Sequence, residues 1–460
     1  MTPLELGLLG AGVLLFGVPS STVGVAPRWG GAIGLALGGS FLALGAGNLF
    51  LLQWWGSTAA LPHGSGVIGF FPAGGSPEYL HHYAGWTHPG GDLKFVLLFL
   101  FSLAGVAFLR RGGTSAEPLL LGLLSVVAGL ITFSVDNLIL LYLGLELQAL
   151  CLYTLVGFFK FQEERTDSAV RYLLSGSLVS GFMLLGFARL YGGAGTFHLS
   201  ELTTWDSIGS AWVVGVVLFK VGAAPFHFWA PVVYTPLEWG TLALTTGAAK
   251  VNLWYLLVGP LAGSPAWWPT WWAGVISVGV GSIGGFFQTS LGGVLAYSGV
   301  INGGYLLLLS TAVSPGGYFF YGYYLVVYLV GTAVLVGVLS VWGDTRFETQ
   351  FSAWGKLGVG FPLVVYYLTL NLGGLPVFPG FFAKLALLSG LAGFGFFLLW
   401  GVVAASVVPA VYYVSVGVGA LFKPTSAEVV PPGWVHPVVV ATLVVGLNGL
   451  LNFVALTVGM

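Results

Sequence analysis

The sequence has very few charged residues. Asp, Glu, Lys and Arg make up 6% of its 460 residues, against about 25% in a soluble globular protein. Such a chain cannot cover a soluble domain with polar side chains, and 57% of it is hydrophobic, with a mean hydropathy of +0.95. This composition predicts a protein that crosses a membrane many times and contacts its lipids. A net charge of −1 argues against nucleic acid as a partner.

Cysteine is also nearly absent, since Cys151 is the only one in the chain. One thiol makes no intrachain disulfide and cannot supply the roughly four ligands that an iron–sulfur cluster needs. No G-x-G-x-x-G motif opens a βαβ unit. We therefore expect no redox cofactor and no metal within this chain.

Apolar runs of about 20 residues, the length of a membrane-crossing helix, recur along the whole chain. They predict an all-α polytopic membrane protein with about 14 transmembrane helices. Two runs, 208–234 and 358–391, are over-long and contain prolines, which interrupt helices. The expected spans are 4–19, 28–52, 93–110, 117–135, 138–159, 168–192, 208–234, 239–261, 267–288, 290–312, 316–342, 358–391, 395–421 and 436–458.

The basic residues test this number of spans. Those in or beside the predicted loops, apart from Lys94, all follow odd-numbered spans and so share one side of the membrane. By the positive-inside rule this side is the cytoplasm or the matrix. Both termini are then predicted on the periplasmic or intermembrane-space side. The residues are Arg28, Arg110, Arg111, Lys160, Arg165, Arg171, Arg346, Lys356 and Lys423.

Four basic residues fall within spans: Arg189, Lys220, Lys250 and Lys384. Burying such a charge at the bilayer centre costs roughly 2.5–3.5 kcal/mol even on a lenient scale, so each needs a partner or a water-filled path. For Arg189, late in its span, we expect contact with lipid headgroups. The three lysines are candidate proton carriers, although snorkelling or a static ion pair would also explain Lys220.

Lys220 lies in FKVGAAPFHFW (219–229), where Pro225 predicts a helix break and His227 adds a group that exchanges protons near neutral pH. His227 is a candidate relay, with a simple hydrogen bond to a backbone carbonyl as the alternative. The stretch NLGGLPVFPGFFAKLALL repeats this theme with two prolines and Lys384. The two interrupted helices look like corresponding positions in two internal repeats. Lys250 is expected in an unbroken helix between them.

An acidic residue, Glu146, lies within the span that begins near 138. Lys220 is its natural partner, since a buried carboxylate needs a cation. The pair keeps both groups charged, and separating them would ease the release of the lysine's proton. A purely structural counter-ion is the alternative role.

The polar loop 56–92 contains four histidines: His63, His81, His82 and His88. Adjacent histidines point apart in regular structure, and no acid or cysteine completes a ligand set there. We expect a solvated or partner-facing loop rather than a metal site.

Four stretches resemble the antiporter-like subunit 2 of NADH:ubiquinone oxidoreductase (respiratory complex I), which is subunit N in bacteria. They are LYLGLELQALCLYTL (141–155), RYLLSGSLVSGFMLLGFARLYGGAGTFHL (171–199), FKVGAAPFHFWAPVVY (219–234) and LGGLPVFPGFFAKLAL (372–387). The resemblance runs from about residue 130 to residue 390, in matching order and spacing. It implies that Glu146, Lys220, Lys250 and Lys384 are the proton-translocating residues.

The resemblance also implies two inverted five-helix repeats, with discontinuous helices 7 and 12. The expected units are an N-terminal three-helix segment at 1–111, repeats at 117–261 (helices 4–8) and 267–421 (helices 9–13), and a C-terminal helix at 422–460. FMN, iron–sulfur clusters, NADH and ubiquinone would bind elsewhere in the complex. Its other membrane-arm subunits, including neighbouring antiporter-like subunits, would be the partners.

Two departures from the family pattern stand out. Val232 replaces an aspartate of the A-P-D-V-Y motif, and Asn302, in INGGY, replaces the histidine of S-H-A-G-Y. Such drift favours a divergent organelle-encoded copy in the mitochondrial inner membrane, with the bacterial cytoplasmic membrane as the alternative.

The sequence therefore predicts a proton-translocating membrane-arm subunit that couples NADH oxidation and quinone reduction elsewhere in the complex to proton pumping. An Mrp-type cation/proton antiporter subunit is the alternative, because it shares the fold and the buried lysines. A structural assembly subunit is a third possibility.

Overall fold

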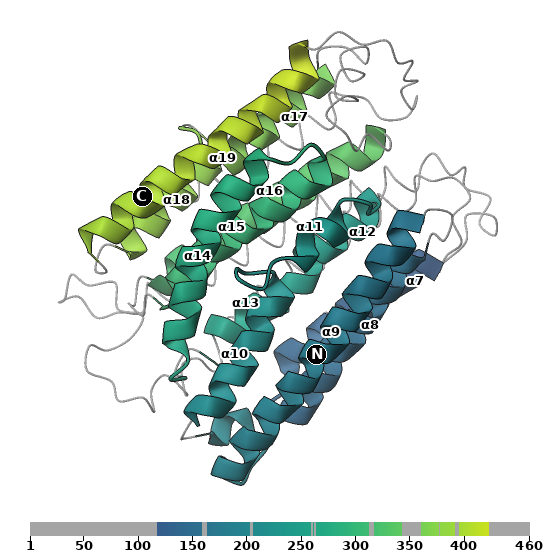
Figure 1. The fold of residues 1–460 in the computed structure, drawn as a ribbon, viewed down its shortest axis with the longest axis vertical. Helices are drawn as coiled ribbons and strands as arrows, with labels where there is room; N and C mark the ends of the chain where they lie inside the picture. Colours follow the sequence, from purple (N-terminus) through teal and green to yellow (C-terminus); the bar gives the residue numbers. More distant parts are fainter. Residues whose placement is uncertain are drawn as a thin grey trace, which may run out of the picture.

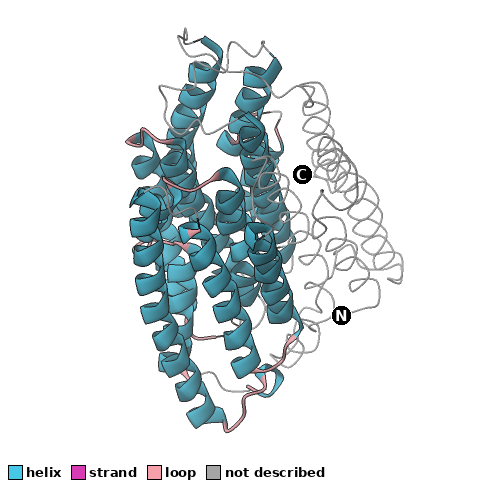
Figure 2. Ribbon diagram, turned by 90° about the vertical axis from the view of Figure 1, so that its right-hand side faces the viewer, coloured by secondary structure: helices cyan, strands magenta, loops and turns pink. Residues whose placement is uncertain are grey.

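The computed structural model describes residues 117–158, 163–202, 206–258, 261, 264–311, 317–342, 360–376, 378–391 and 395–422. Within these ranges the chain is helical apart from turns and one isolated bridge between Asn137 and His198. The helices run side by side along one direction (Figures 1 and 2). The other predicted spans, 4–19, 28–52, 93–110 and 436–458, and loop 56–92 lie outside the described residues.

Each span predicted between residues 117 and 421 has a helical counterpart. Five described helices are long and apolar enough to cross a membrane, in whole or in part. They are α8 (Leu138–Gly157), α9 (Glu163–Ala194), α15 (Leu291–Thr311), α16 (Gly317–Trp342) and α19 (Phe396–Phe422). The others are α7 (Glu117–Ser134), η2 (Leu199–Glu201), α10 (Ser207–Val221), α11 (Trp229–Tyr234), α12 (Trp239–Ala243), η3 (Leu244–Ala248), α13 (Ala249–Val258), α14 (Trp267–Phe286), α17 (Gly360–Gly373) and α18 (Pro379–Gly390). The all-helical membrane architecture is confirmed, whereas the total of 14 helices and the repeats stay predictions.

Polar residues fix where two of these helices begin. The Asn137 side chain accepts hydrogen bonds from the N–H groups of Ile139 and Leu140 at the start of α8. Asp206 does the same for Gly209 at the start of α10. Both residues satisfy N–H groups that have no partner within the helix.

The helices follow one another across the molecule. In Figure 1, α7 to α9 lie at one edge, α17 to α19 at the other, and α10 to α16 between them. The central position of α15 shows in its burial, because 94% of its apolar window is buried against 33% for α9 and α19. The outer face of α9 carries exposed leucines such as Leu174 and Leu178, as a lipid-facing helix should.

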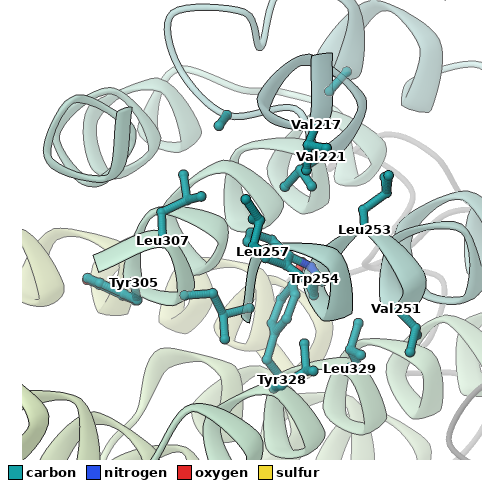
Figure 3. Packing of buried hydrophobic residues seen from close by; sticks show 14 of the residues in the cluster. Val217, Val221, Val251, Leu253, Trp254, Leu257, Tyr305, Leu307, Tyr328 and Leu329 are labelled. Carbon is teal, nitrogen blue, oxygen red and sulfur yellow. The ribbon is translucent and has the colours of Figure 1, made fainter. Parts of the chain in front are cut away.

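The core between the two edges is built around Trp254 of α13. Figure 3 shows Trp254 and Leu257 between Val217 and Val221 of α10 on one side and Tyr328 of α16 on the other. All five side chains are buried. This packing fixes α10, α13 and α16 relative to one another, and these helices hold or adjoin the candidate site.

Small residues allow α14 and α15 to approach closely. A Cβ atom added at Gly281 of α14 would lie 2.5 Å from the backbone nitrogen of Ile301 in α15. Close backbone approach through glycine is a common way of packing helices within membranes. Gly279, two residues earlier in α14, has nothing within 4 Å of its Cβ position.

Gly281→Ala should therefore force α14 and α15 apart and lower the free energy of unfolding by about 1–3 kcal/mol, as overpacking does. Gly279→Ala is the matched control and should be neutral or slightly stabilising, because alanine favours helix more than glycine. Thermal unfolding of the detergent-solubilised protein measures both. Equal effects of the two substitutions would contradict this account of the contact.

Candidate functional site

Helix α10 ends where its sequence requires it to end. Gly222 adopts a left-handed φ of +82°, and the Ala223 N–H bonds back to the Leu218 carbonyl at 2.9 Å. This closure is a Schellman motif, which favours glycine at its left-handed position. Pro225 follows and has no backbone donor, so helix resumes only at Trp229. The predicted break is therefore present.

Side chains satisfy backbone groups that the break releases. The Trp229 indole donates to the Phe219 carbonyl at 2.9 Å. The Ala224 N–H donates to the Ser277 hydroxyl of α14 at 2.8 Å. Irregular backbone is tolerated at membrane depth only where protein or water meets its polar groups, and these two bonds supply partners from within the protein.

Glu146 and Lys220 form an ion pair across α8 and α10, as the sequence predicted. The Lys220 ammonium lies 2.6 Å from Glu146 Oε1, and the side chains are 11% and 18% exposed. The Ser180 hydroxyl of α9 donates to the same oxygen at 2.5 Å. Three helices thus meet at one carboxylate through charge-assisted hydrogen bonds.

A small cavity adjoins Lys220. Its volume is about 30 Å³, and its lining includes Gln148, Tyr153 and Thr245. This is roughly the room that one water molecule needs, with polar groups to hold it. Gln148 also accepts a hydrogen bond from Asn252 of α13 at 2.8 Å, so polar groups extend from the ion pair towards the next helix.

Lys250 lies near the start of α13 and is 4% exposed. Its helix is unbroken, as predicted, but includes a π-turn, η3, directly before α13; such turns are frequent at functional sites. Its ammonium lies 5.5 Å from the ring centroid of Tyr234, within reach of a cation–π interaction. It also lies 3.9 Å from the Cβ position at Gly222. Lys250 therefore faces the carbonyl end of α10, where the helix dipole is negative.

Lys384 occupies the second break, between α17 and α18. Its ammonium donates to the Gly373 carbonyl at 2.5 Å and, more weakly, to the Ser406 carbonyl at 3.4 Å. Its side chain lies over Gly374, where a Cβ atom would be 2.6 Å from the lysine Cε. The lysine thus caps the carbonyl end of α17.

The two breaks are built alike, but their lysines do not correspond. Gly374 has a φ of +69° and closes α17 in the way that Gly222 closes α10. In α10, Lys220 lies two residues before Gly222. The residue two before Gly374 in α17 is Leu372. Lys384 lies beyond its break and bonds back across it. The two lysines thus differ in their position relative to the break, while the correspondence of the two interrupted helices stays a prediction.

His227 lies in the turn between α10 and α11 and is 9% exposed. Its ring centroid is 4.8 Å from that of Phe228 and 6.0 Å from that of Tyr297. Among the described residues, no hydrogen bond or ion pair joins it to Glu146 or Lys220. Its relay role stays a prediction.

Arg189 lies outside the buried constellation. Its guanidinium donates to the Asp206 carboxylate at 3.0 Å on an exposed surface, which is a protein partner that the sequence did not predict. The Gly209 N–H and then Arg189 hold the pKa of Asp206 below its usual range. This pair stabilises the start of α10 rather than contributing to the site.

Sequence reasoning missed several polar side chains in the interior. Ser180, Gln148 and Asn252 contact the first lysine site or its surroundings. Ser298 and Tyr413 hydrogen bond each other between α15 and α19. Each of these is a polar residue within an apolar span. That pattern could have marked them in the sequence, because a buried polar group needs a hydrogen-bond partner.

Comparison with known proteins gives the family. A family model described as NADH:quinone oxidoreductase/Mrp antiporter, TM, matches residues 135–409, which include Glu146, Lys220, Lys250 and Lys384. NADH-quinone oxidoreductase subunit N of Hydrogenovibrio crunogenus is 31% identical over 355 residues, which cover 71% of this chain and 74% of the relative. The chain belongs to the NADH:quinone oxidoreductase/Mrp antiporter family of membrane proteins.

Solved structures share the fold. A chain of respiratory complex I from Thermus thermophilus with bound aureothin has a TM-score of 0.74 at 24% identity, covering 99% of this chain and 97% of that one. A chain of the Mrp complex from Dietzia sp. DQ12-45-1b has a TM-score of 0.69 at 19% identity, covering 94% and 83%. The sources named here are bacterial, so they do not support the mitochondrial origin predicted from sequence drift.

Glu146→Gln should leave the Lys220 charge buried without its counter-ion and lower the free energy of unfolding by about 3–5 kcal/mol. Adding Lys220→Met removes that charge, so the double variant should be more stable than Glu146→Gln alone. Thermal or denaturant unfolding in detergent measures this double-mutant cycle. Strictly additive losses would show that the two groups do not interact.

Proposed function

We propose that the chain is a proton-translocating membrane-arm subunit of an NADH:quinone oxidoreductase. The observation that carries this proposal is the buried Glu146–Lys220 pair at the end of an interrupted helix, with Lys250 at the same helix end. Charged groups are costly inside a membrane and usually mark ion pathways. The 31% identity to NADH-quinone oxidoreductase subunit N of Hydrogenovibrio crunogenus supports the choice of this complex.

The ion pair supplies a means of controlling one proton. While Glu146 accepts bonds from Lys220 and Ser180, the lysine stays protonated. A small movement of α8, α9 or α10 that lengthens the 2.6 Å contact would leave the ammonium without its counter-ion and favour loss of the proton. Water in the adjoining cavity would receive it.

Lys250 is the next proton carrier. Lys220 and Lys250 both lie at the carbonyl end of α10, one within its last turn and the other across Gly222. The end of α10 thus brings the two candidate carriers to one region of the structure. We propose that protons enter near Lys250 from the positively charged loop side and move to Lys220 or onward to Lys384.

Lys384 is the candidate exit group. It is held by backbone carbonyls, Gly373 above all, rather than by a described carboxylate. A carbonyl partner stabilises the ammonium less than an ion pair does, so Lys384 needs no counter-ion to be displaced before it releases a proton. Exit would run from here to the face opposite the basic loops.

The division into inverted repeats at 117–261 and 267–421, with interrupted helices 7 and 12, belongs to this proposal. Its support is that α10 and α17 both end in a left-handed glycine followed by a break and a second short helix, α11 or α18. Broken helices of this kind form ion sites at the middle of many transporters. The N-terminal segment 1–111 and the helix expected in 422–460 would complete the subunit.

Electron transfer would take place in other subunits. FMN, iron–sulfur clusters, NADH and the quinone would bind there, and this chain would be one subunit of the oxidoreductase rather than an enzyme by itself. Its partners would be other membrane-arm subunits, with neighbouring antiporter-like subunits among them. We place it in the cytoplasmic membrane of a bacterium, because the named relatives are bacterial.

An Mrp-type cation/proton antiporter is the second candidate. The Dietzia Mrp chain shares the fold, and the family model includes both kinds of protein. Co-purification of flavin-containing and iron–sulfur subunits with this chain would favour the oxidoreductase. Sodium/proton exchange by a complex that lacks them would favour the antiporter.

Lys220→Ala should lower NADH-driven proton pumping by about tenfold or more in the assembled complex, because the transfer loses its proton carrier. Pumping is measured in proteoliposomes with a pH-sensitive dye during NADH oxidation by quinone. Arg171→Ala is the control, because Arg171 pairs with Asp167 at the exposed start of α9, and it should leave pumping unchanged.

Assembly is checked by the iron–sulfur content of the purified complex. NADH oxidation with a water-soluble acceptor, which bypasses the membrane arm, checks that the redox subunits are active. Intact pumping and quinone reduction in Lys220→Ala would instead support a structural assembly role for this chain.

A further inference from the structure

A cluster of hydroxyl and amide groups lies at the centre of the molecule, where α15, α16 and α19 meet. We call Ser298, Asn302, Tyr324 and Tyr413 the Asn302 cluster. Tyr324 donates to Asn302 Oδ1 at 2.6 Å, and Asn302 Nδ2 donates to the Ser298 hydroxyl at 3.3 Å and to its carbonyl at 2.8 Å. The Tyr413 hydroxyl donates to the Ser298 hydroxyl. All four side chains are buried.

One end of the Asn302 cluster adjoins Lys250. The Lys250 ammonium and the Tyr328 hydroxyl lie 3.6 Å and 3.4 Å from the Cβ position at Gly299. Gly299 is the neighbour of Ser298 in α15, and it leaves open the space that a larger residue would fill. The lysine therefore approaches α15 at the residue next to the cluster.

At the other end, the ring of Tyr413 packs against the residue whose carbonyl holds Lys384. The Tyr413 ring lies 3.5 Å from the Cβ position at Gly373, and the Gly373 carbonyl accepts the hydrogen bond of the Lys384 ammonium. The Asn302 cluster thus lies between two lysines that no direct contact joins among the described residues.

The hydroxyl groups and the amide group of the Asn302 cluster differ in whether they can relay a proton. A hydroxyl both accepts and donates, so Ser298 and Tyr413 can each take up one proton and release their own without keeping a charge. The amide of Asn302 only donates at nitrogen and only accepts at oxygen. It cannot relay a proton in this way, but it fixes the direction of the hydrogen bonds around it. Ser298 accepts from both Asn302 and Tyr413, which leaves its own hydrogen for another acceptor.

We infer that Asn302 is a positioning residue that orients Ser298, Tyr324 and Tyr413 into an uncharged hydroxyl link between Lys250 and Lys384. Transfer to the lysine at each end requires a bridging water. This inference rests on the proposed proton-translocating function and adds residues to its path. The link carries protons one at a time without a titrating side chain at position 302.

Tyr413→Phe tests the link, because it removes one hydroxyl and keeps the ring that packs on Gly373. In proteoliposomes of the assembled complex, NADH-driven pumping should fall about tenfold or more. Tyr321→Phe is the matched control. Tyr321 is also buried and also makes one hydroxyl hydrogen bond, to the Trp254 carbonyl at 2.9 Å, but it is not part of the cluster. It should pump like the wild type.

Asn302 itself is tested by two variants. Asn302→Leu removes both of its cluster contacts at similar volume and should lower pumping as Tyr413→Phe does. Asn302→His restores the histidine of the family pattern and places a titrating group in the link, so the pH profile of pumping should differ from that of the wild type. A role in packing alone would not add this pH dependence.

Lys220→Ala serves as the reference in the same assay. If it blocks pumping while Asn302→Leu and Tyr413→Phe match Tyr321→Phe, the link is wrong and the proposed function stands. If Lys220→Ala pumps normally, the proposed function fails and the link fails with it. Assembly is verified for each variant by the presence of this chain in the purified complex together with its iron–sulfur content.

Discussion

A polar group inside a bilayer has no water to bond with, and the two interrupted helices of this chain are built on that constraint. Each break leaves carbonyls at a helix end, and each lies beside a buried lysine. Lys384 donates to the Gly373 carbonyl, and Lys250 lies against the end of α10. At the second break the carbonyls serve as acceptors for the lysine, and at the first break Trp229 and Ser277 also satisfy the released backbone groups.

Glu146 gives the first site a property that the second lacks. Its carboxylate holds Lys220 from another helix, so the lysine's charge depends on how α8 and α10 sit relative to each other. A buried ion pair is poor at adding stability, because desolvating two charges cancels most of their attraction. It is well suited to a switch, since a small displacement changes the proton affinity of both groups. The adjoining cavity gives the released proton a place to go.

Much of this could be predicted from the sequence. Apolar run length and Pro225 located the spans and the first break, and the need of Glu146 for a cation identified Lys220. The hydrogen bond from Lys384 back to the Gly373 carbonyl could not be predicted, because sequence spacing does not show across which helix end a flexible side chain reaches. The Ser298–Tyr413 contact joins residues 115 positions apart, and periodicity does not show which helices face each other.

Helix α15 connects the two lysine sites. It presents Gly299 to Lys250 and Ser298 to Tyr413, and it is the most buried of the described membrane-crossing helices. Its backbone is held against α14 at Gly281, where no room exists for a Cβ atom. The proposed link between Lys250 and Lys384 needs no movement of this backbone, because hydroxyl groups reorient by rotating about a single bond.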